Sequence, residues 1–529
     1  MPLPRHLKGL ITRIGHSLPF FPRFNRAKTA VVTLDATQPI FTVSPYYLSY
    51  SIDISVLVGG FWWEGSMGVR KGLGTLRVPP LDLNNKKLDR LVDALGPAYI
   101  RVGGSEADKI VYFEQLEAGK NELVLTKPMW DQLHGFIQRN NLALVFTFKY
   151  GLFNRQAHGE WDGIEIQKLL EYSNQKGYKI AVCELGNELN AYWAFHGVTA
   201  QPSAKNLAID YSTFAKLIKT SLPEAKIMGP GSAFWPKLGE TLKPLSNLSK
   251  KFLANLDFEI DIVSWHYYPF QSRRSPIRTR TATLRSLLSP KSYGYFTKYA
   301  EQLRNWRDRF QPQADLWAGE TGSAQCGGQP QLSDRFASCF WWADQLGQGA
   351  ALGQKVMIRQ SLIGGDYGMI NRLTIKPRPD YWVSWLWARL MGTEVYAVSC
   401  SHKRLRVYCH QHPNRKHKTV LFINSSRFNV DTQLNQLGEI GTTAKIVDRY
   451  VLTASSITAN KIFINNKKAK FRKGKVNLSD FNQFHQGNSP LEPHDKIKNN
   501  IDRKKSEQAQ GVNLSILPHS ISFYVINHQ

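Results

Sequence analysis

Continuous apolar runs alternate with amphipathic stretches over most of the chain. Seven or eight such units lie between about residues 46 and 392, and each pairs a strand-like run with a stretch of helical periodicity. Apolar strands that alternate with helices are typical of a parallel sheet covered by helices. The pattern therefore predicts an α/β fold, a (β/α)8 TIM barrel with insertions over 46–392. The expected strands are Tyr46–Ile54, Tyr99–Val102, Leu142–Phe148, Ile180–Leu185, Lys226–Met228, Ile262–Trp265, Leu316–Ala318 and Lys355–Arg359.

The pattern changes after about residue 393. Short β-like runs separated by polar, turn-rich segments predict an all-β sandwich over 393–529. The expected strand Ala30–Leu34 lies before the barrel, and we expect the segment 30–45 to pack with this sandwich. Residues 484–511 are polar and charged and are expected to form a mobile basic loop. Residues 1–29 are expected to be a flexible basic leader, without the continuous apolar region of a clear signal peptide.

Composition narrows the class of protein. Hydrophobic residues make up 42% of the chain and aromatic residues 12%, which excludes a disordered protein. The chain contains no run of ~18 or more apolar residues, so no transmembrane helix is predicted. Five scattered cysteines without a CxxC pair argue against a disulfide framework and a structural zinc site. Cys183 and Cys339 lie in apolar stretches, so we expect both to be buried.

The charge balance points to a polyanionic partner. Lys and Arg total 68 against 41 Asp and Glu, which gives a net charge of +27. Nucleic acid, an anionic membrane surface and an acidic polysaccharide all fit this excess, as does a simple role in solubility. No nucleic-acid-binding motif occurs, so we expect no nucleic acid partner. Weak contact with an anionic membrane stays open, and we expect a monomer.

Two of the predicted strands end in a glutamate. Glu188 closes Ala181–Glu188, and Glu320 closes Leu316–Glu320. In a (β/α)8 barrel the catalytic groups lie where strands end, and glycosidic bond cleavage needs two carboxyl groups. Glu184 shares a strand face with Glu188 but lies deeper, so we interpret it as a structural acid.

Other polar residues follow the predicted strands, among them Asn187, His266, Tyr268 and Gln360. His266 and Tyr268 would equally fit a buried core. His266 has no His or Asp partner at ligand spacing, so we expect no metal site and no cofactor.

Motifs distributed along the chain resemble one family. They include Glu184–Glu188, Ser264–Tyr268, Gly319–Thr321, Pro379–Trp382 and Ser522–Ile526. These motifs occur in the order found in glycoside hydrolase family 79, the heparanase-like β-glucuronidases. The chain resembles this family from about residue 30 to the end. Gly-Asn-Glu alone marks only the wider clan of barrel glycosidases, whereas the ordered set is specific to the family.

The resemblance implies a retaining mechanism. Glu188 would be the acid/base and Glu320 the nucleophile, with their carboxyl groups about 5–5.5 Å apart. Asn187 would contact the sugar 2-hydroxyl, while His266 and Tyr268 would position Glu320.

Further substrate-binding positions carry over by residue. The walls of a glucuronate subsite would be formed by Asp53, Ser105, Gln360 and Tyr367. Backbone amides at Gly327 would hold the sugar carboxylate.

Departures from the family also carry predictions. The animal enzyme has an excised linker soon after the Gly103-Gly-Ser105 strand end, and 106–129 contains no such insert. We therefore expect a bacterial-type single chain that needs no processing. Gln325 replaces a tyrosine, and Phe234–Lys237 replaces an expected glutamine and arginine. An alternative basic wall would come from Arg273, Arg274, Arg278, Arg280 and Arg285.

Several functions stay open at this level. The first is an endo-acting retaining β-glucuronidase on heparan sulfate or a related acidic glycan. The second is an exo-β-glucuronidase on short glucuronides, and a remote third is a non-catalytic heparin-binding protein. The location in the cell is not determined by the sequence, although such a substrate favours a secreted, periplasmic or cell-surface protein.

Overall fold

The computed structural model describes residues 28–63, 76–113, 123–151, 161–197, 200–235, 238–240, 247–276, 278–437, 445–482 and 511–527. The expected leader, apart from its last two residues, and nearly all of the expected mobile loop 484–511 lie outside these ranges. The predicted domain limits at 45/46 and 392/393 stay predictions.

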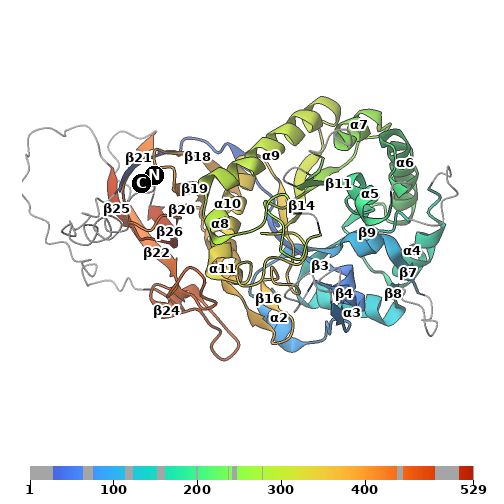
Figure 1. Ribbon diagram of the computed structural model, residues 1–529, viewed down its shortest axis with the longest axis horizontal. Coiled ribbons are helices and arrows are strands. Elements are labelled where there is room, and N and C mark those ends of the chain that lie inside the picture. The colour runs from blue at the N-terminus through green and yellow to red at the C-terminus, as the bar shows by residue number, and fades with distance from the viewer. Residues whose placement is uncertain are drawn as a thin grey trace, which may run out of the picture.

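Eight parallel strands close into a barrel, which confirms the predicted fold class (Figure 1). Their order is β10-β9-β6-β3-β15-β14-β13-β11, and β10 pairs with β11 to complete the circle. Parallel strands direct their carboxyl ends to the same rim, so residues that follow different strands meet there. The strands are β3 (Leu48–Asp53), β6 (Ala98–Gly103), β9 (Leu142–Phe148), β10 (Val182–Leu185), β11 (Lys226–Trp235), β13 (Ile262–Tyr267), β14 (Asp315–Thr321) and β15 (Val356–Arg359).

Helices surround the barrel. Several begin with a side-chain cap; the hydroxyl of Thr126, for example, accepts a hydrogen bond from the Met129 amide at the start of α3. The longer helices are α2 (Lys86–Asp93), α3 (Lys127–Arg139), α4 (Ile164–Lys176), α6 (Ala204–Ser221), α7 (Leu248–Asn255), α9 (Pro290–Phe310), α10 (Phe336–Ala351) and α11 (Pro379–Leu390). Short elements in the connections are α1 (Ile54–Val58), α5 (Tyr192–Phe195), α8 (Leu284–Leu287), β4 (Gly60–Trp62), β5 (Leu76–Val78), β7 (Ile110–Tyr112), β8 (Leu123–Leu125), β12 (Leu238–Gly239), β16 (Ile370–Asn371) and β17 (Lys376–Pro377). None of the described helices is long and apolar enough to cross a membrane.

The remaining strands form a second sheet beside the barrel. Its order is β24-β23-β22-β26-β20-β19-β18-β1-β21-β25, and β2 (Phe41–Thr42) pairs with β18. The N-terminal strand β1 (Lys28–Asp35) therefore lies between two C-terminal strands. The sheet curls on itself and encloses a core of its own that includes Val32, Phe422 and Leu514. The other strands are β18 (Glu394–Cys400), β19 (Leu405–Gln411), β20 (His417–Asn424), β21 (Val430–Leu437), β22 (Lys445–Thr453), β23 (Phe463–Ile464), β24 (Lys467–Lys468), β25 (Val512–Ile516) and β26 (Ser520–Asn527).

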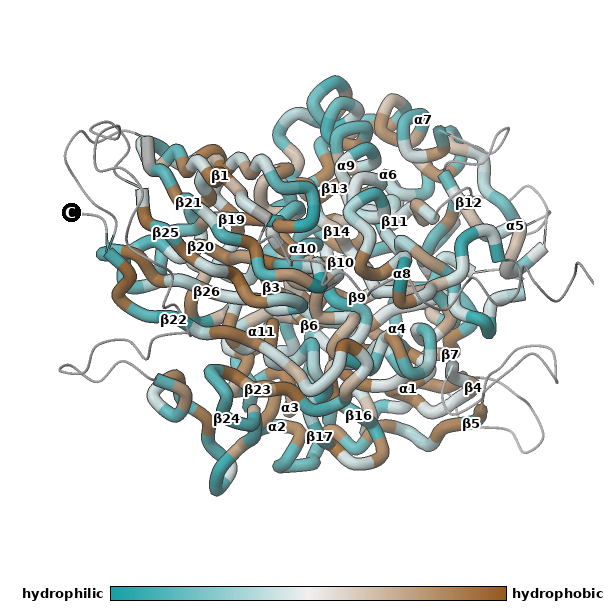
Figure 2. The backbone as a smooth tube through the Cα atoms, turned by 60° about the vertical axis from the view of Figure 1, so that its left-hand side comes forward, coloured by the Kyte–Doolittle hydropathy of each residue, from teal (hydrophilic) through white to brown (hydrophobic). Residues whose placement is uncertain are grey.

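Hydrophobic residues gather inside the barrel and between the barrel and the curled sheet, where Figure 2 shows many brown segments. Helix α10 is buried from Phe336 to Ala350, because it contacts barrel helices as well as β18, β19, β20 and β26. All five cysteines are free, and Cys183 and Cys339 are buried as predicted.

Candidate active site

A tight turn after β10 places Glu188 at the rim of the barrel. Glu188 has φ 51° and ψ 48°, a left-handed backbone conformation, and Gly186 has φ 72°. A Cβ on Gly186 would lie 2.7 Å from Leu189 and 2.9 Å from Tyr150, so only glycine fits this turn. The glutamate is 4% exposed.

A β-bulge brings Glu320 next to His266. The register between β13 and β14 pairs Trp265 with Ala318 but His266 with Glu320, which leaves Gly319 as the extra residue. A bulge of this kind changes the direction of the side chain that follows it. Glu320 is 6% exposed and His266 is fully buried.

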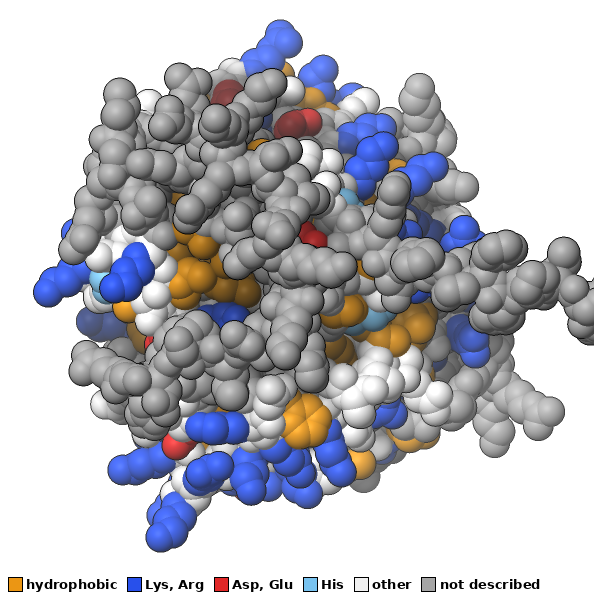
Figure 3. All heavy atoms as spheres, turned by 90° about the vertical axis from the view of Figure 1, so that its left-hand side faces the viewer, with side chains coloured by type: hydrophobic (Ala, Val, Ile, Leu, Met, Phe, Trp, Pro, Cys, Tyr) orange, Lys and Arg blue, Asp and Glu red, His pale blue; other side chains and the backbone are white. Residues whose placement is uncertain are grey.

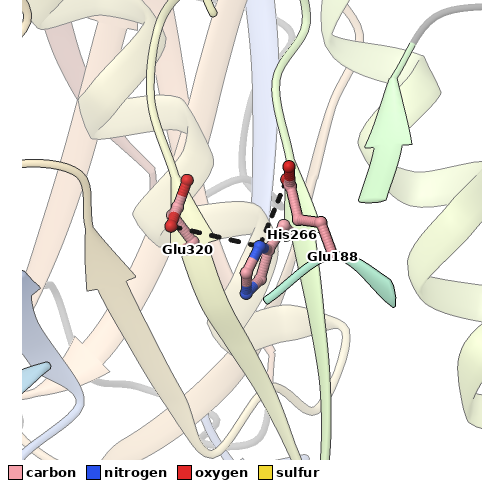
Figure 4. Close-up of side chains that lie close together, drawn as sticks. All are labelled: Glu188, His266 and Glu320. Atoms are coloured by element: carbon pink, nitrogen blue, oxygen red, sulfur yellow. Dashed lines mark hydrogen bonds and ion pairs between the residues drawn. The ribbon is translucent and has the colours of Figure 1, made fainter. Parts of the chain in front are cut away.

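The three side chains converge (Figure 4). His266 Nδ1 lies 3.2 Å from Glu188 Oε1 and 4.0 Å from Glu320 Oε2. One nitrogen or oxygen atom from each residue lies within 4.8 Å of the others. The two glutamates predicted from separate strand ends therefore share one buried site.

Arg101 connects these groups from β6. Its guanidinium donates to Glu320 Oε2 at 2.8 Å, to Glu184 Oε2 at 2.7 Å and to Asn187 Oδ1 at 2.8 Å. Glu184 also accepts from the Thr147 hydroxyl at 2.7 Å. No catalytic or substrate-binding role was predicted for this arginine. Its signal in the sequence was a charge inside an apolar strand, which requires a buried acidic partner.

We expected no metal site at His266, and the structure brings possible ligand atoms together there. The sequence showed no His or Asp partner for His266, yet the structure places two glutamates within reach of it. Arg101 pairs with Glu320, so a cation placed there would be repelled by the guanidinium.

Burial shifts the pKa values of Glu188 and His266 in opposite directions. It raises the pKa of Glu188 well above its usual value, and the negative charge of Glu320 adds to the shift. The Arg101 guanidinium and the Trp235 indole oppose this shift in part. Burial, assisted by Arg101, lowers the pKa of His266 well below its usual value, so the imidazole is neutral. Glu188 is thus suited to carry a proton.

Both oxygens of Glu320 accept hydrogen bonds. Tyr268 donates its hydroxyl proton to Oε1 at 2.6 Å, while Arg101 holds Oε2. Burial raises the pKa of Tyr268 well above its usual value, so this hydroxyl keeps its proton and donates. Donors on both oxygens fix the orientation of the Glu320 carboxyl group.

Several predicted binding residues lie around this pair. Asp53 caps α1 by accepting from the Ser55 amide at 2.9 Å, and Gln360 Nε2 lies 3.5 Å from its other oxygen. Burial raises the pKa of Asp53 to about 8, and the charge of Glu320 contributes. The Tyr367 ring lies 6.4 Å from that of Tyr268.

Of the remaining predicted binding residues, Gly327 and Arg274 are packed against neighbouring residues, whereas Arg273 and Ser105 are more accessible to solvent. Gly327 has φ 74°, and a Cβ there would lie 2.3 Å from Trp63, so the loop approaches Trp63 as only glycine allows. Arg274 is buried and its guanidinium pairs with Asp366 at 2.6 Å, so it braces this loop. Arg273 is exposed, and Ser105 is half-buried at the start of the 3₁₀ turn after β6.

Comparison with known proteins places the chain in a family. A family model described as glycosyl hydrolase family 79, N-terminal domain, matches residues 74–347. Heparanase-like protein 1 of Arabidopsis thaliana is 30% identical over 367 residues, which cover 65% of this chain and 65% of that protein. Heparanase of Bos taurus is 28% identical over 79% of this chain and 80% of its own length. Hyaluronoglucuronidase of Hirudo nipponia is 25% identical over 84% of this chain and 92% of its own length.

Solved structures support the same fold. The GH51 arabinofuranosidase from Xanthomonas axonopodis pv. citri superposes with a TM-score of 0.64 at 13% identity, covering 94% of this chain and 100% of that chain. At that identity the likeness concerns the fold alone.

The family model spans more than half of the chain and includes both β10 with Glu188 and β14 with Glu320. The chain therefore belongs to glycoside hydrolase family 79.

Proposed function

We propose that this protein is a retaining, endo-acting glycoside hydrolase that cleaves β-glucuronide linkages in acidic polysaccharide. The observation that carries the proposal is that one carboxylate oxygen of Glu188 and one of Glu320 lie within 4.8 Å of each other, in unlike electrostatic surroundings. Retaining enzymes hold their carboxyl groups about 5–5.5 Å apart, whereas inverting enzymes leave about 6.5–9.5 Å for a water molecule. The short separation therefore supports retention.

The first chemical step follows from these surroundings. The Glu320 carboxylate attacks the anomeric carbon, and the bond from that carbon to the leaving oxygen breaks. Glu188 gives its proton to the leaving oxygen, which departs as a hydroxyl group. The product is a glycosyl ester on Glu320 with Glu188 ionised.

The second step regenerates both groups. Ionised Glu188 takes a proton from water, whose oxygen attacks the anomeric carbon and releases the Glu320 carboxylate. As Glu320 regains its charge, Arg101 and Tyr268 stabilise it through the hydrogen bonds described above. His266 was expected to position Glu320, but its Nδ1 lies nearer to Glu188, at 3.2 Å against 4.0 Å. As a neutral imidazole it fixes the position of Glu188.

Three observations support a glucuronide substrate. Relatives include proteins named heparanase and hyaluronoglucuronidase. The glycine-rich loop at Gly327 lies near Tyr367 and offers backbone amides, which suit a carboxylate. The net charge of +27 favours a polyanion.

The proposal is tested by hydrolysis of heparan sulfate, hyaluronan and an aryl β-glucuronide. We expect Glu320→Gln to lower turnover of every cleaved substrate by about 10³-fold or more. Glu188→Gln should lower polymer cleavage by about 10²–10⁴-fold, because the leaving sugar needs a proton. An aryl glucuronide with an acidic phenol should lose much less in the first step. The matched control is Glu224→Gln, an exposed glutamate that loses the same charge.

Product analysis decides the mechanism and the mode of attack. Retention requires that the first product seen by NMR is the β-anomer, and an α-anomer would contradict it. Fast loss of polymer length indicates endo action, whereas release of single glucuronate units from chain ends would favour the exo alternative. Folded protein that cleaves none of the substrates would overturn the proposed function.

A further inference from the structure

Residues 460–476, which we name the basic excursion, carry a dense cluster of positive charge. The segment 461–475 contains seven basic residues and no acidic residue. All seven side chains are exposed, and Figure 3 shows Lys and Arg gathered along the lower edge of this face, at the height where Figure 1 places β24. The seven are Lys461, Lys467, Lys468, Lys470, Arg472, Lys473 and Lys475.

Buried contacts hold the excursion against the barrel. Phe471 packs on Tyr381 and Trp382 of α11, with ring centroids 6.1 and 5.7 Å apart. Ile462 and Ile464 are buried in the main hydrophobic core. The charged side chains therefore project from a fixed backbone.

A tight hairpin turn presents the end of the cluster. The Arg472 amide donates to the Lys475 carbonyl at 2.8 Å, and the Lys475 amide donates back at 3.0 Å. Lys473 and Gly474 between them have φ 47° and 78°, the left-handed conformations that a two-residue hairpin needs.

The charges lack neutralising partners within the described residues. None of the seven side chains forms an ion pair there, and Lys467 Nζ donates only to the backbone carbonyl of Asp480 at 3.0 Å. Clustered like charges repel one another and destabilise the folded state, so an ordinary solvated surface mixes both signs. A bound polyanion would relieve this repulsion.

The excursion is connected to the substrate side of the barrel through α2. A Cβ on Gly474 would lie 3.4 Å from Arg90 of α2. On the same helix, Lys87 Nζ donates at 2.8 Å to the carbonyl of Thr374, between β16 and β17. That hairpin directly follows the loop that contains Tyr367.

We propose that the basic excursion is a second binding surface, separate from the cleavage site, for the acidic polysaccharide substrate. The identity of this ligand rests on the proposed function, whereas the demand for a polyanion rests on the charge itself. Six of the seven residues are lysines, which bind carboxylate and sulfate as mobile point charges rather than through the fixed fork of arginine. The surface should thus hold a long chain without requiring one sulfation pattern.

The test compares two variants with equal loss of charge. The excursion variant carries Lys468→Gln, Lys470→Gln, Lys473→Gln and Lys475→Gln. The control variant carries Lys205→Gln, Lys216→Gln, Lys251→Gln and Lys298→Gln, which are exposed residues of α6, α7 and α9. Binding of heparin, hyaluronan and a single-stranded oligonucleotide is measured in the Glu320→Gln background, so that turnover does not interfere.

We expect the excursion variant to bind the glycans about tenfold more weakly near 0.1 M salt, with a shallower salt dependence, and the control variant to change by less than about twofold. In the background with Glu320 intact, the KM for polymer should rise while turnover of an aryl glucuronide stays unchanged. Equal weakening in both variants, or binding of the oligonucleotide alone, would overturn the proposal. Glycan binding that depends on the excursion in a protein that cleaves no glucuronide would refute the proposed function and leave the second surface standing.

Discussion

At the level of single residues, burial decides which carboxyl groups of the site hold a proton. Glu188 and Asp53 are both buried and have raised pKa values, and in both cases the charge of Glu320 adds to the effect. Glu320 instead receives a guanidinium and a hydroxyl group. Two acids with raised pKa values thus stand beside a glutamate held by two donors, which is the kind of division that acid-assisted displacement needs.

Asp53 should make substrate binding sensitive to alkaline pH. Its pKa of about 8 means that the carboxyl group is neutral below this pH and becomes charged as pH rises through it. The new negative charge would face Glu320 and the carboxylate of a bound glucuronate. We expect the inhibition constant of a glucuronic acid analogue to rise several-fold between pH 7 and pH 9. The wild type and Asp53→Asn are compared by inhibition across this range.

Asp53→Asn should remove the part of the increase in the inhibition constant that comes from ionisation of Asp53. The amide stays neutral and still accepts the hydrogen bond from Ser55. Ionisation of Glu188 affects both proteins, so the difference between the two pH profiles isolates Asp53. Identical profiles would show that Asp53 does not face the ligand.

The predicted residues of the site show what local sequence can supply. Glu188 and Glu320 were found because each follows an apolar strand, and their meeting follows from the parallel barrel. The bridging role of Arg101 was missed, since its partners lie on β10 and β14 and come together only when the barrel closes. No spacing along the chain records that contact.

At the level of elements, the connection from β15 to α11 depends on one buried arginine. Arg359 donates to the Tyr367 carbonyl at 2.8 Å and to Asp380 at 2.7 Å, and it also contacts the Gln360 carbonyl. The guanidinium lies over the Trp341 ring, 5.0 Å from its centroid. Arg359 therefore fixes the backbone of two predicted substrate-binding residues without lying at the reacting centre.

Arg359→Lys should weaken substrate binding more than it slows chemistry. Lysine keeps the charge but cannot hold three acceptors in one plane, so the segment 360–367 would loosen. We expect the KM for an aryl glucuronide to rise about tenfold, with kcat within about threefold. The control is Arg309→Lys, an exposed arginine of α9. A fall in kcat as large as the rise in KM, or unfolding at assay temperature, would point to a general structural role instead.

The elements were predicted unequally, for identifiable reasons. The expected strand Leu142–Phe148 coincides with β9, an apolar run whose ends are clear. The strand expected at Lys226–Met228 continues to Trp235, because the sheet passes Gly229-Pro230-Gly231 with a register shift instead of ending there. The order of strands in the curled sheet depends on distant pairings such as β1 with β21, which no local pattern contains.

At the level of the whole molecule, the barrel and the curled sheet share helix α10. Asp344 of this helix accepts from Arg406 Nε and from the Tyr408 hydroxyl, both at 2.7 Å, and both donors belong to β19. The approach is close, because a Cβ on Gly347 would lie 2.2 Å from the Tyr408 ring. Such contacts imply that the two parts stabilise each other and unfold together.

Asp344→Ala should separate the unfolding of the two parts. The change removes the acceptor of both hydrogen bonds from β19 and of one from Gln348 within α10, which we expect to cost about 2–4 kcal/mol of the free energy of unfolding. Arg406 is one third exposed at its side chain and regains water, so Arg406→Gln should cost less than Asp344→Ala. Arg404→Gln, on an exposed neighbour, serves as the control.

All 14 tryptophans lie between residues 62 and 387, so tryptophan fluorescence follows the barrel alone, while far-UV circular dichroism follows both parts. The two signals should share one thermal midpoint in the wild type and Arg404→Gln but diverge in Asp344→Ala. A single unchanged midpoint in Asp344→Ala would mean that the apolar packing of α10 joins the two parts without this contact.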